Sequence, residues 1–195
     1  QAMIAVVDYG SGNVAAIADI YKRLKVPHVV TAEHAVLRAA DRFVLPGVGA
    51  FDTTMRHFID SGLVDLLNEQ VLGLQKKVLG ICVGMQILAD SSEEGEQAGL
   101  GWIPGRVRKI DASLLRRGPQ LPHMGWNSIR TVGHPDLFEG VDQARGFYFL
   151  HSYYFDAGDE RHVSALVDYG KQMPCAVARG NVFGMQFHPE KSHAN

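Results

Sequence analysis

Residues 77–86 read Lys-Val-Leu-Gly-Ile-Cys-Val-Gly-Met-Gln, an apolar run that leads into a cysteine between two glycines. The apolar, β-branched residues predict a buried strand, and residues 83–89 favour a helix. The pattern Gly-x-Cys-x-Gly at a strand-to-helix junction is the thiol form of a nucleophile elbow. Such a turn is strained and pushes the side chain out of the sheet. Glycine at positions 80 and 84 removes side chains that would collide across the turn.

Cys82 is therefore the predicted nucleophile. The positive end of the following helix should favour thiolate over thiol. The next backbone amide, that of Val83, should be free to donate to an oxyanion. The alternative is a buried structural cysteine, because free cysteine is among the most buried residue types. Cys175 lies in an expected strand and is assigned to the core. Two cysteines are too few for a disulfide framework, so a reducing cytoplasm is the expected location.

Strands and helices alternate on both sides of this junction, which predicts an α/β fold with a mostly parallel central sheet flanked by helices. Helices are expected at 14–24 and 51–72, the second with a break near Gly62. Residues 91–130 are rich in glycine, proline and charge, and predict loops with short antiparallel strands. The expected strands are 3–7, 28–31, 42–45, 78–81, 146–150, 162–168, 175–179 and 182–187.

The length of 195 residues, without repeats or linkers, favours one domain over residues 3–195. Gln1 and Ala2 precede Met3, which resembles a native start, so both are set aside as added residues. The helix that usually covers the last parallel strand is expected to be absent or to follow Asn195. A net charge of −2 offers no basic surface for nucleic acid. No apolar run approaches the ~20 residues that span a bilayer, so no membrane contact is expected.

A thiolate that attacks a carbonyl needs a base nearby, and a leaving amine needs a proton. His188 is the predicted base because it ends an expected strand, at the edge where parallel sheets present ligands. Pro189 biases it to an extended conformation, so Glu190 should point the same way and hold the ring, which completes a Cys–His–Glu triad. An ordinary His-Pro-Glu loop is the alternative explanation. His123 and His151 remain alternative bases.

These motifs resemble the class I, triad-type glutamine amidotransferases. Within that family the chain is similar to the glutaminase subunits of imidazole glycerol phosphate synthase, a likeness favoured by Pro-His-Met-Gly-Trp-Asn at 122–127 and by Lys-Ser after His-Pro-Glu. There are two departures: Val83 stands where leucine is more usual, and the family's C-terminal helix is missing from the sequence. The matching stretches are 8–13, 45–51, 80–86, 99–105, 122–127, 148–153 and 184–192.

The resemblance implies a flavodoxin-like sheet and hydrolysis of L-glutamine to glutamate and ammonia through a cysteinyl thioester, with no cofactor and no metal. The ammonia would pass to a separate synthase (cyclase) subunit in a heterodimer. That subunit would make imidazole glycerol phosphate and the by-product aminoimidazole carboxamide ribonucleotide in histidine biosynthesis. The implied residues are Cys82, His188 and Glu190 for catalysis, the backbone of Val83 and Val48 for the oxyanion hole, and Gly47, Gly49, Gln86, Ser152 and Tyr153 for glutamine.

The partner surface is expected at the carboxyl edge of the strands, with Trp126 at an apolar centre and Asn13 and Lys191 beside it. The alternatives are the same glutaminase serving another synthase, for example in sugar amidation, a cysteine hydrolase or peptidase with other substrates, and a catalytically inactive binding subunit. Residues 10–15 also imitate a Gly-x-Gly-x-x-Ala dinucleotide fingerprint, with Glu33 at about the right distance, but short glycine signatures are weak. No closely spaced His/Cys pair fits a zinc pattern.

Overall fold

The computed structural model describes residues 2–115, 120–133 and 135–192. Across these residues the largest sheet has eight strands in the order β2-β1-β3-β4-β13-β12-β11-β8. The first five are mutually parallel, and the last three continue the sheet in antiparallel fashion. This confirms the predicted α/β fold. Their bounds are β2 His28–Thr31, β1 Ile4–Val7, β3 Arg42–Leu45, β4 Lys77–Ile81, β13 Val182–Met185, β12 Gln172–Arg179, β11 Val163–Asp168 and β8 Arg130–Thr131.

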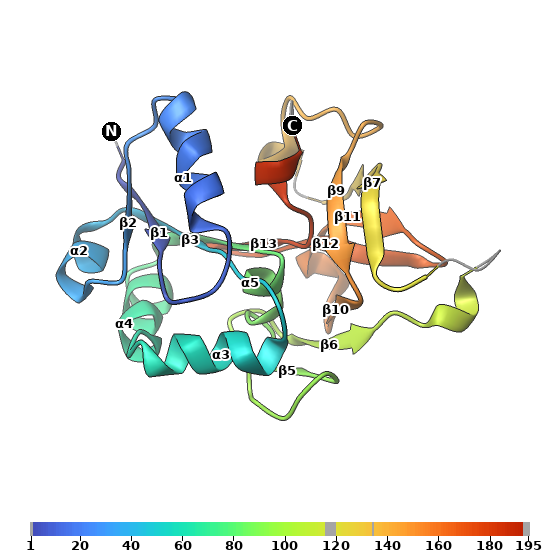
Figure 1. Ribbon diagram of the computed structural model, residues 1–195, viewed down its shortest axis with the longest axis horizontal. Coiled ribbons are helices and arrows are strands. Elements are labelled where there is room, and N and C mark those ends of the chain that lie inside the picture. The colour runs from blue at the N-terminus through green and yellow to red at the C-terminus, as the bar shows by residue number, and fades with distance from the viewer. Residues whose placement is uncertain (1, 116–119, 134, 193–195) are drawn as a thin grey trace.

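Helices cover both faces of the parallel half of the sheet (Figure 1). Helix α1 (Val14–Arg23) lies on one face, while α3 (Phe51–Asp60), α4 (Val64–Leu67) and α5 (Val83–Gln86) lie on the other. A π-helical turn, η1 (Asn68–Gly73), continues α4, so the predicted break between helices near Gly62 is confirmed. The short helix α2 (His34–Ala39) was not predicted. Large apolar side chains fill the layer between the sheet and α3, among them Phe43, Leu45, Phe51, Phe58 and Leu67.

Two smaller sheets occupy the other end of the molecule (Figure 1). Strands β5 (Ser91–Ser92), β6 (Gly105–Lys109) and β10 (Tyr153–Ala157) form one, and β7 (His123–Asn127) pairs with β9 (Phe147–His151) in the other. The second half of the chain also contains short 3₁₀ turns: η2 Ala112–Leu114, η3 Pro135–Phe138, η4 Glu160–His162 and η5 Pro189–Lys191. The sequence predicted β9 within one residue at each end but missed β10, which follows it after a single residue.

The α1 face of the sheet carries a groove of about 560 Å³ over β4 and β13, lined by Leu79, Phe183, Tyr21 and Leu137 among others. The helix expected over the last parallel strand stays a prediction. Among the described residues, no helix is both long enough and apolar enough to cross a membrane.

Candidate active site

The carboxyl ends of the parallel strands meet at one edge of the sheet, and the residues of interest follow them there. In open α/β sheets ligands bind at this edge, where the strand order changes direction. The order β2-β1-β3 places the change of direction between β1 and β3. The loops after these strands, 8–13 and 46–49, lie beside the cysteine after β4 and the histidine after β13.

Cys82 occupies the turn between β4 and α5 with φ 56° and ψ −117°. A residue other than glycine in such a conformation costs about 1–3 kcal/mol and is characteristic of functional sites. Close backbone packing explains both neighbouring glycines. A Cβ on Gly84 would lie 2.0 Å from the Leu45 carbonyl oxygen, and one on Gly80 would lie 2.5 Å from the Gly84 carbonyl oxygen. The turn is therefore the tight elbow that the sequence predicted.

Helix α5 is shorter than predicted, because it ends at Gln86 rather than at residue 89. After Gln86 the hydrogen bonds tighten from the i−4 to the i−3 carbonyl: Leu88 N–H donates to Met85 O at 3.0 Å, and Ala89 N–H donates to Gln86 O at 3.1 Å. The loop 99–103 prevents any further helix, because Leu100 N–H donates to Ile87 O at 2.7 Å and Gly101 N–H donates to Ala89 O at 3.1 Å. A helix of one turn has little dipole to offer a thiolate. Stabilisation of the Cys82 anion therefore depends on its side-chain neighbours.

His188 is the neighbour that supplies this stabilisation. Its Nδ1 lies 2.7 Å from Glu190 Oε1, with the two side chains only 4% and 3% exposed. Burial alone would lower the pKa of His188, but its hydrogen bonds with the Cys82 and Glu190 side chains outweigh burial and raise the pKa to about 9. The ring is therefore protonated at neutral pH and faces the sulfur as a cation. The backbone is extended at His188 and turns into η5 at Pro189, which brings Glu190 back onto the ring.

The two backbone amides expected to be oxyanion donors, those of Val83 and Val48, are not free. The Val83 N–H donates to the Gly47 carbonyl oxygen at 3.1 Å, so the expectation of an unpaired amide after the nucleophile is wrong for this structure. The reason is close packing of two turns: a Cβ on Gly47 would lie 2.5 Å from Gly84 N. The second donor implied by the resemblance, Val48 N–H, is held by Ser11 Oγ at 3.1 Å.

A substrate carbonyl oxygen could accept from these two amides only if the loop 46–49 changed its position. Its other contacts hold it in place: the Tyr9 hydroxyl donates to Pro46 O, and Thr54 Oγ1 donates to Val48 O at 3.2 Å. Gly49 has φ 88° and no atom near the position of a Cβ, so the end of the loop has room to change conformation. Sequence reasoning missed Tyr9 and Ser11, although both lie in the loop after β1.

The residues expected to bind glutamine are partly brought together. Gln86 is buried, and its Nε2 donates to Gln186 Oε1 at 3.0 Å and approaches Tyr153 O at 3.4 Å. Ser152 and Tyr153 form the half-buried junction of β9 and β10. Gln186 was missed; its Nε2 lies 3.7 Å from Cys82 Sγ. Its position two residues before His188, on the same side of an extended chain, was the available signal.

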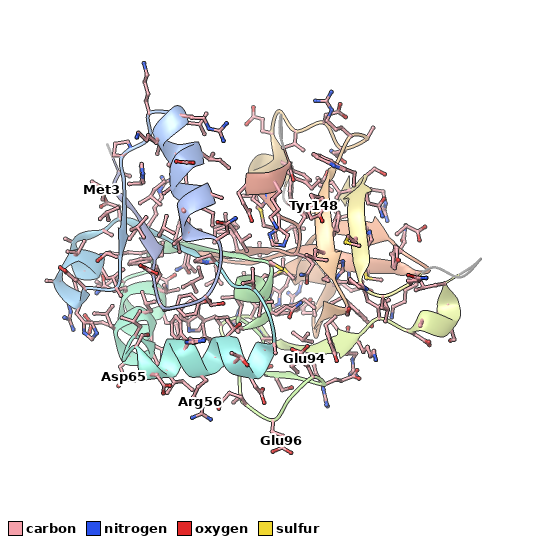
Figure 2. All side chains as sticks on the ribbon, in the orientation of Figure 1. Met3, Arg56, Asp65, Glu94, Glu96 and Tyr148 are labelled. Atoms are coloured by element: carbon pink, nitrogen blue, oxygen red, sulfur yellow. The ribbon has the colours of Figure 1, made fainter. Side chains whose placement is uncertain are left out.

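Glu94 is a second residue that the sequence did not single out. Its Oε1 accepts from Phe51 N at 2.6 Å, which places the carboxylate at the amino end of α3, as Figure 2 shows. After burial, the charges of Glu94 and Glu93 are the causes that raise the pKa of Tyr153. A carboxylate near Tyr153 is suited to the ammonium group of an amino-acid substrate.

The two alternative bases lie elsewhere. His123 and His151 are not in loops but on β7 and β9, as cross-strand neighbours. His123 Nδ1 lies 2.9 Å from His151 Nε2, and burial lowers the pKa of His123 to about 4 and that of His151 to about 3. Groups that titrate so low are poor acceptors for the proton of a thiol at neutral pH. His188 is the base that this geometry favours.

The three residues expected at the partner surface are in different settings. Asn13 caps α1, where its Oδ1 accepts from Ala16 N at 3.3 Å. Trp126 lies on the outer face of β7 with 45% of its surface exposed. Lys191 is exposed on η5, with Nζ 5.7 Å from the ring centre of Tyr148, which is labelled in Figure 2. Exposure of Trp126 and Lys191 is compatible with partner contact, which stays a prediction.

A strained cysteine at the carboxyl edge of a mainly parallel α/β sheet, beside a buried histidine held by a carboxylate, is the arrangement typical of triad-type thiol enzymes. Residues 5–195 match the family described as Glutamine amidotransferase class-I, and the chain belongs to this family. The predicted family resemblance is thereby confirmed, and the enzyme is a glutamine amidotransferase.

Similar proteins cover almost the whole chain. A protein of Bdellovibrio bacteriovorus named imidazole glycerol phosphate synthase subunit HisH is 48% identical over 98% of this chain and 94% of its own length. A Leptospira borgpetersenii protein of the same name is 42% identical over 99% and 95%. Among solved structures, a glutamine amidotransferase has a TM-score of 0.71 at 20% identity, covering 95% of this chain and 90% of its own. Another glutamine amidotransferase, from Thermotoga maritima, reaches 0.64 at 18%, covering 97% and 76%. At such identities the structures support the fold alone.

Proposed function

We propose that this chain is the glutaminase subunit of an imidazole glycerol phosphate synthase. Identity of 42–48% over nearly the full length to relatives that carry this name supports the subfamily. The observation that carries the chemistry is the His188–Glu190 pair beside Cys82. Both cysteines are free thiols, which suits the reducing cytoplasm where we place the protein.

The geometry supports a two-step acyl transfer on L-glutamine. The Cys82 thiolate attacks the side-chain amide carbon and forms a tetrahedral intermediate. The C–N bond then breaks, and the imidazolium of His188 gives its proton to the leaving nitrogen, so that ammonia departs and a thioester remains. Neutral His188 next takes a proton from water. The hydroxide attacks the thioester, and glutamate leaves as the sulfur recovers its electron pair. Glu190 holds the ring and balances its charge throughout.

The closed oxyanion site supports a dependence on the partner. Because the Val83 and Val48 amides are both paired, neither of these two expected donors is available to the tetrahedral oxyanion until the loop 46–49 shifts. An oxyanion donor is worth a factor of about 10²–10³ in turnover. We therefore expect slow glutamine hydrolysis by the isolated chain and faster hydrolysis when an acceptor-loaded synthase subunit favours the shifted loop. Such regulation prevents waste of glutamine.

The outer face of β7 and β9 is the proposed centre of the partner surface. Met124 and Leu150 are directly opposite each other in the register and are 65% and 37% exposed, and Trp126 lies two residues along. An apolar centre with a charged rim that includes Lys191 is typical of a heterodimer interface. A closed path from this site would deliver ammonia to the acceptor before it is protonated.

The test is reconstitution with a purified cyclase-type synthase subunit. We expect a stable one-to-one complex, stimulation of glutamate release by the loaded partner, and glutamine-dependent formation of imidazole glycerol phosphate. Full glutaminase activity of the isolated chain, unchanged by the partner, would contradict the proposal. Stimulation only by a synthase that amidates a sugar would assign the same chemistry to another pathway.

A further inference from the structure

Strands β7 and β9 hold a buried histidine pair that has no role in the proton transfers proposed for glutamine hydrolysis. His123 and His151 face each other in the register, and Nδ1 of His123 lies 2.9 Å from Nε2 of His151. The His123 ring also stacks on Phe149 and Tyr169, with ring centres 4.7 and 4.0 Å apart. The stacking and the hydrogen bond together fix the orientation of the ring.

The partners of the two rings determine which nitrogens carry protons. A carbonyl oxygen only accepts, so His151 Nδ1, 2.8 Å from Tyr153 O, carries a hydrogen. In the neutral ring Nε2 is then bare and accepts from the Nδ1–H of His123. The bare Nε2 of His123 accepts in turn from Asn127 Nδ2 at 3.3 Å. The Asn127 orientation is fixed because Nδ2 also donates to Asp168 O at 3.0 Å.

Both rings are neutral under ordinary conditions. Burial lowers the pKa of His123 to about 4 and the pKa of His151 to about 3. An added proton would also set two N–H groups face to face, either between the rings or between His123 and Asn127. The hydrogen bonds therefore run in one direction, from Asn127 on β7 to the Tyr153 carbonyl at the start of β10.

The chain of hydrogen bonds continues into the active site. Gln86 Nε2 is the second group at the Tyr153 carbonyl, at 3.4 Å, and it also donates to Gln186 Oε1 at 3.0 Å. Gln186 Nε2 lies 3.7 Å from Cys82 Sγ. The bond from His151, at 2.8 Å, is the shorter of the two contacts at the Tyr153 carbonyl.

We propose that His123 and His151 are positioning residues for glutamine: they hold the Tyr153 carbonyl, and through it the Gln86 amide, in the orientation that binds the amino-acid end of the substrate. Neither ring touches the reacting atoms. The inference rests on the proposed function, which makes Gln86 and Tyr153 glutamine contacts. It also links two regions, because the outward residues of β7, Met124 and Trp126, belong to the proposed partner surface.

Two substitutions at one position separate positioning from packing. His123→Phe keeps a ring to stack on Phe149 and Tyr169 but loses the donor to His151. His123→Asn loses the ring but keeps an amide N–H near the place of Nδ1. In the complex with the synthase subunit, we expect His123→Phe to raise the KM for glutamine about tenfold with kcat within about twofold, because binding common to ground and transition states is lost. His123→Asn should restore KM to within about threefold of wild type.

His28→Phe is the matched control, because His28 packs near Tyr21 and hydrogen-bonds Val26 O far from the site. It should leave KM unchanged. An unchanged KM in His123→Phe, or an equal rise in His123→Asn, would overturn the proposal and leave the pair a packing feature. Melting temperatures recorded alongside should not follow KM.

The protonated nitrogen of each ring can be measured without glutamine, so this measurement tests the histidine pair independently of the proposed function. Imidazole ¹⁵N spectra at neutral pH should show both rings as the Nδ1–H form with a bare Nε2, with each ring's signals assigned by their loss in His123→Phe or in His151→Phe. The Nε2–H form in either ring would overturn the relay even if glutaminase activity is normal. A wild-type complex without glutaminase activity would instead remove the proposed function.

Discussion

The pKa values of two buried histidines, His188 and His151, are shifted in opposite directions. His188 is 3% exposed and His151 6%, so both lose most of their hydration on folding. The pKa of His188 nevertheless rises to about 9, while that of His151 falls to about 3. The difference lies in their partners. His188 meets the Glu190 carboxylate and the Cys82 sulfur, whereas His151 meets a carbonyl oxygen and another imidazole.

The comparison shows what an anion adds to a buried imidazole. Burial penalises the charged form at both sites, and only a negative partner compensates for it. His188 can therefore hold and transfer a proton, which hydrolysis needs, while the His123–His151 pair stays neutral and keeps one hydrogen-bond direction. The same residue type thus serves proton transfer in one place and orientation in another.

Loss of the Cys82 sulfur should have the largest effect, because it removes both the nucleophile and one of the two groups that raise the pKa of His188. Cys82→Ala should lower glutaminase turnover by a factor on the order of 10⁴ or more, because the acyl acceptor is gone. It should also lower the pKa of His188 below about 9, since one of the two groups that raise it is lost. Glutamate release and a histidine NMR titration measure the two effects.

Cys175→Ala is the control for this change. Cys175 is fully buried in β12, and burial raises the pKa of its thiol, so it should not react. A glutamine-analogue electrophile should form its adduct on Cys82, as seen by mass spectrometry. An adduct on Cys175, or loss of turnover in Cys175→Ala with a folded protein, would contradict the assignment.

His188 contacts Cys82, and Glu190 holds the His188 ring from the other side. Replacing His188 should lower turnover more than replacing Glu190. His188→Ala removes the proton carrier, and we expect turnover close to that of Cys82→Ala. Glu190→Gln keeps the position of the acceptor oxygen but removes its charge, and turnover should stay about tenfold to a hundredfold higher than in His188→Ala. Steady-state kinetics at neutral pH decides between them. Greater damage from Glu190→Gln would mean that the roles are reversed.

The free energy of unfolding should depend on pH in opposite ways at His188 and His123, because folding raises the pKa of His188 and lowers that of His123. A group whose pKa is raised on folding stabilises the folded state at pH values below its unfolded-state pKa, which is 6.5 for histidine. For His188 this stabilisation is lost as the pH rises through about 9. A histidine whose pKa is lowered on folding has the opposite effect, because protonation then favours the unfolded chain. The unfolded chain binds more protons between pH 6.5 and about 4, so His123 costs stability as pH falls through this window.

Urea unfolding of wild type and His123→Phe at several pH values tests this. The stability advantage of wild type should shrink on acidification from pH 6.5 to 4, by at most about 1.4 kcal/mol per pH unit. For His188→Gln the advantage of wild type should shrink instead between pH 6.5 and 9. Constant differences across both windows would contradict the two pKa shifts.

The elements and contacts that could be predicted from the sequence depend on residues that lie close together in the chain. The strands at 28–31 and 42–45 were predicted to the residue, because short β-branched runs lie between turn residues. Pairing of His188 with Glu190 needed only Pro189 between them. Strand β10 was missed because only Ser152 separates it from β9, so no turn signal marks its start.

The features that could not be predicted depend on contacts between distant residues. The loop 99–103 takes the carbonyl oxygens of the residues that follow helix α5, so the helix cannot continue there. Val83 N–H is paired because a loop far earlier in the chain, at Gly47, packs against the elbow. His123 and His151 meet only through the register of β7 and β9. None of these pairings leaves a mark on the sequence near the residues concerned.

The smallest effect concerns the loop that closes the oxyanion site beside His188. Ser11 Oγ accepts from the Val48 N–H at 3.1 Å and is the one side-chain acceptor that holds this amide among the described residues. Ser11→Ala removes that hydrogen bond and also the one from Ser11 Oγ to Val48 O at 3.2 Å, each worth about 0.5–1.5 kcal/mol, and should favour the shifted loop. We expect glutamine hydrolysis by the isolated chain to rise about two- to tenfold, with a smaller change in the stimulated complex. Ser61→Ala, which removes a hydroxyl bonded to Phe58 O at the far end of α3, is the control and should change neither rate. A lower basal rate in Ser11→Ala would show that Ser11 helps to build the site rather than to close it.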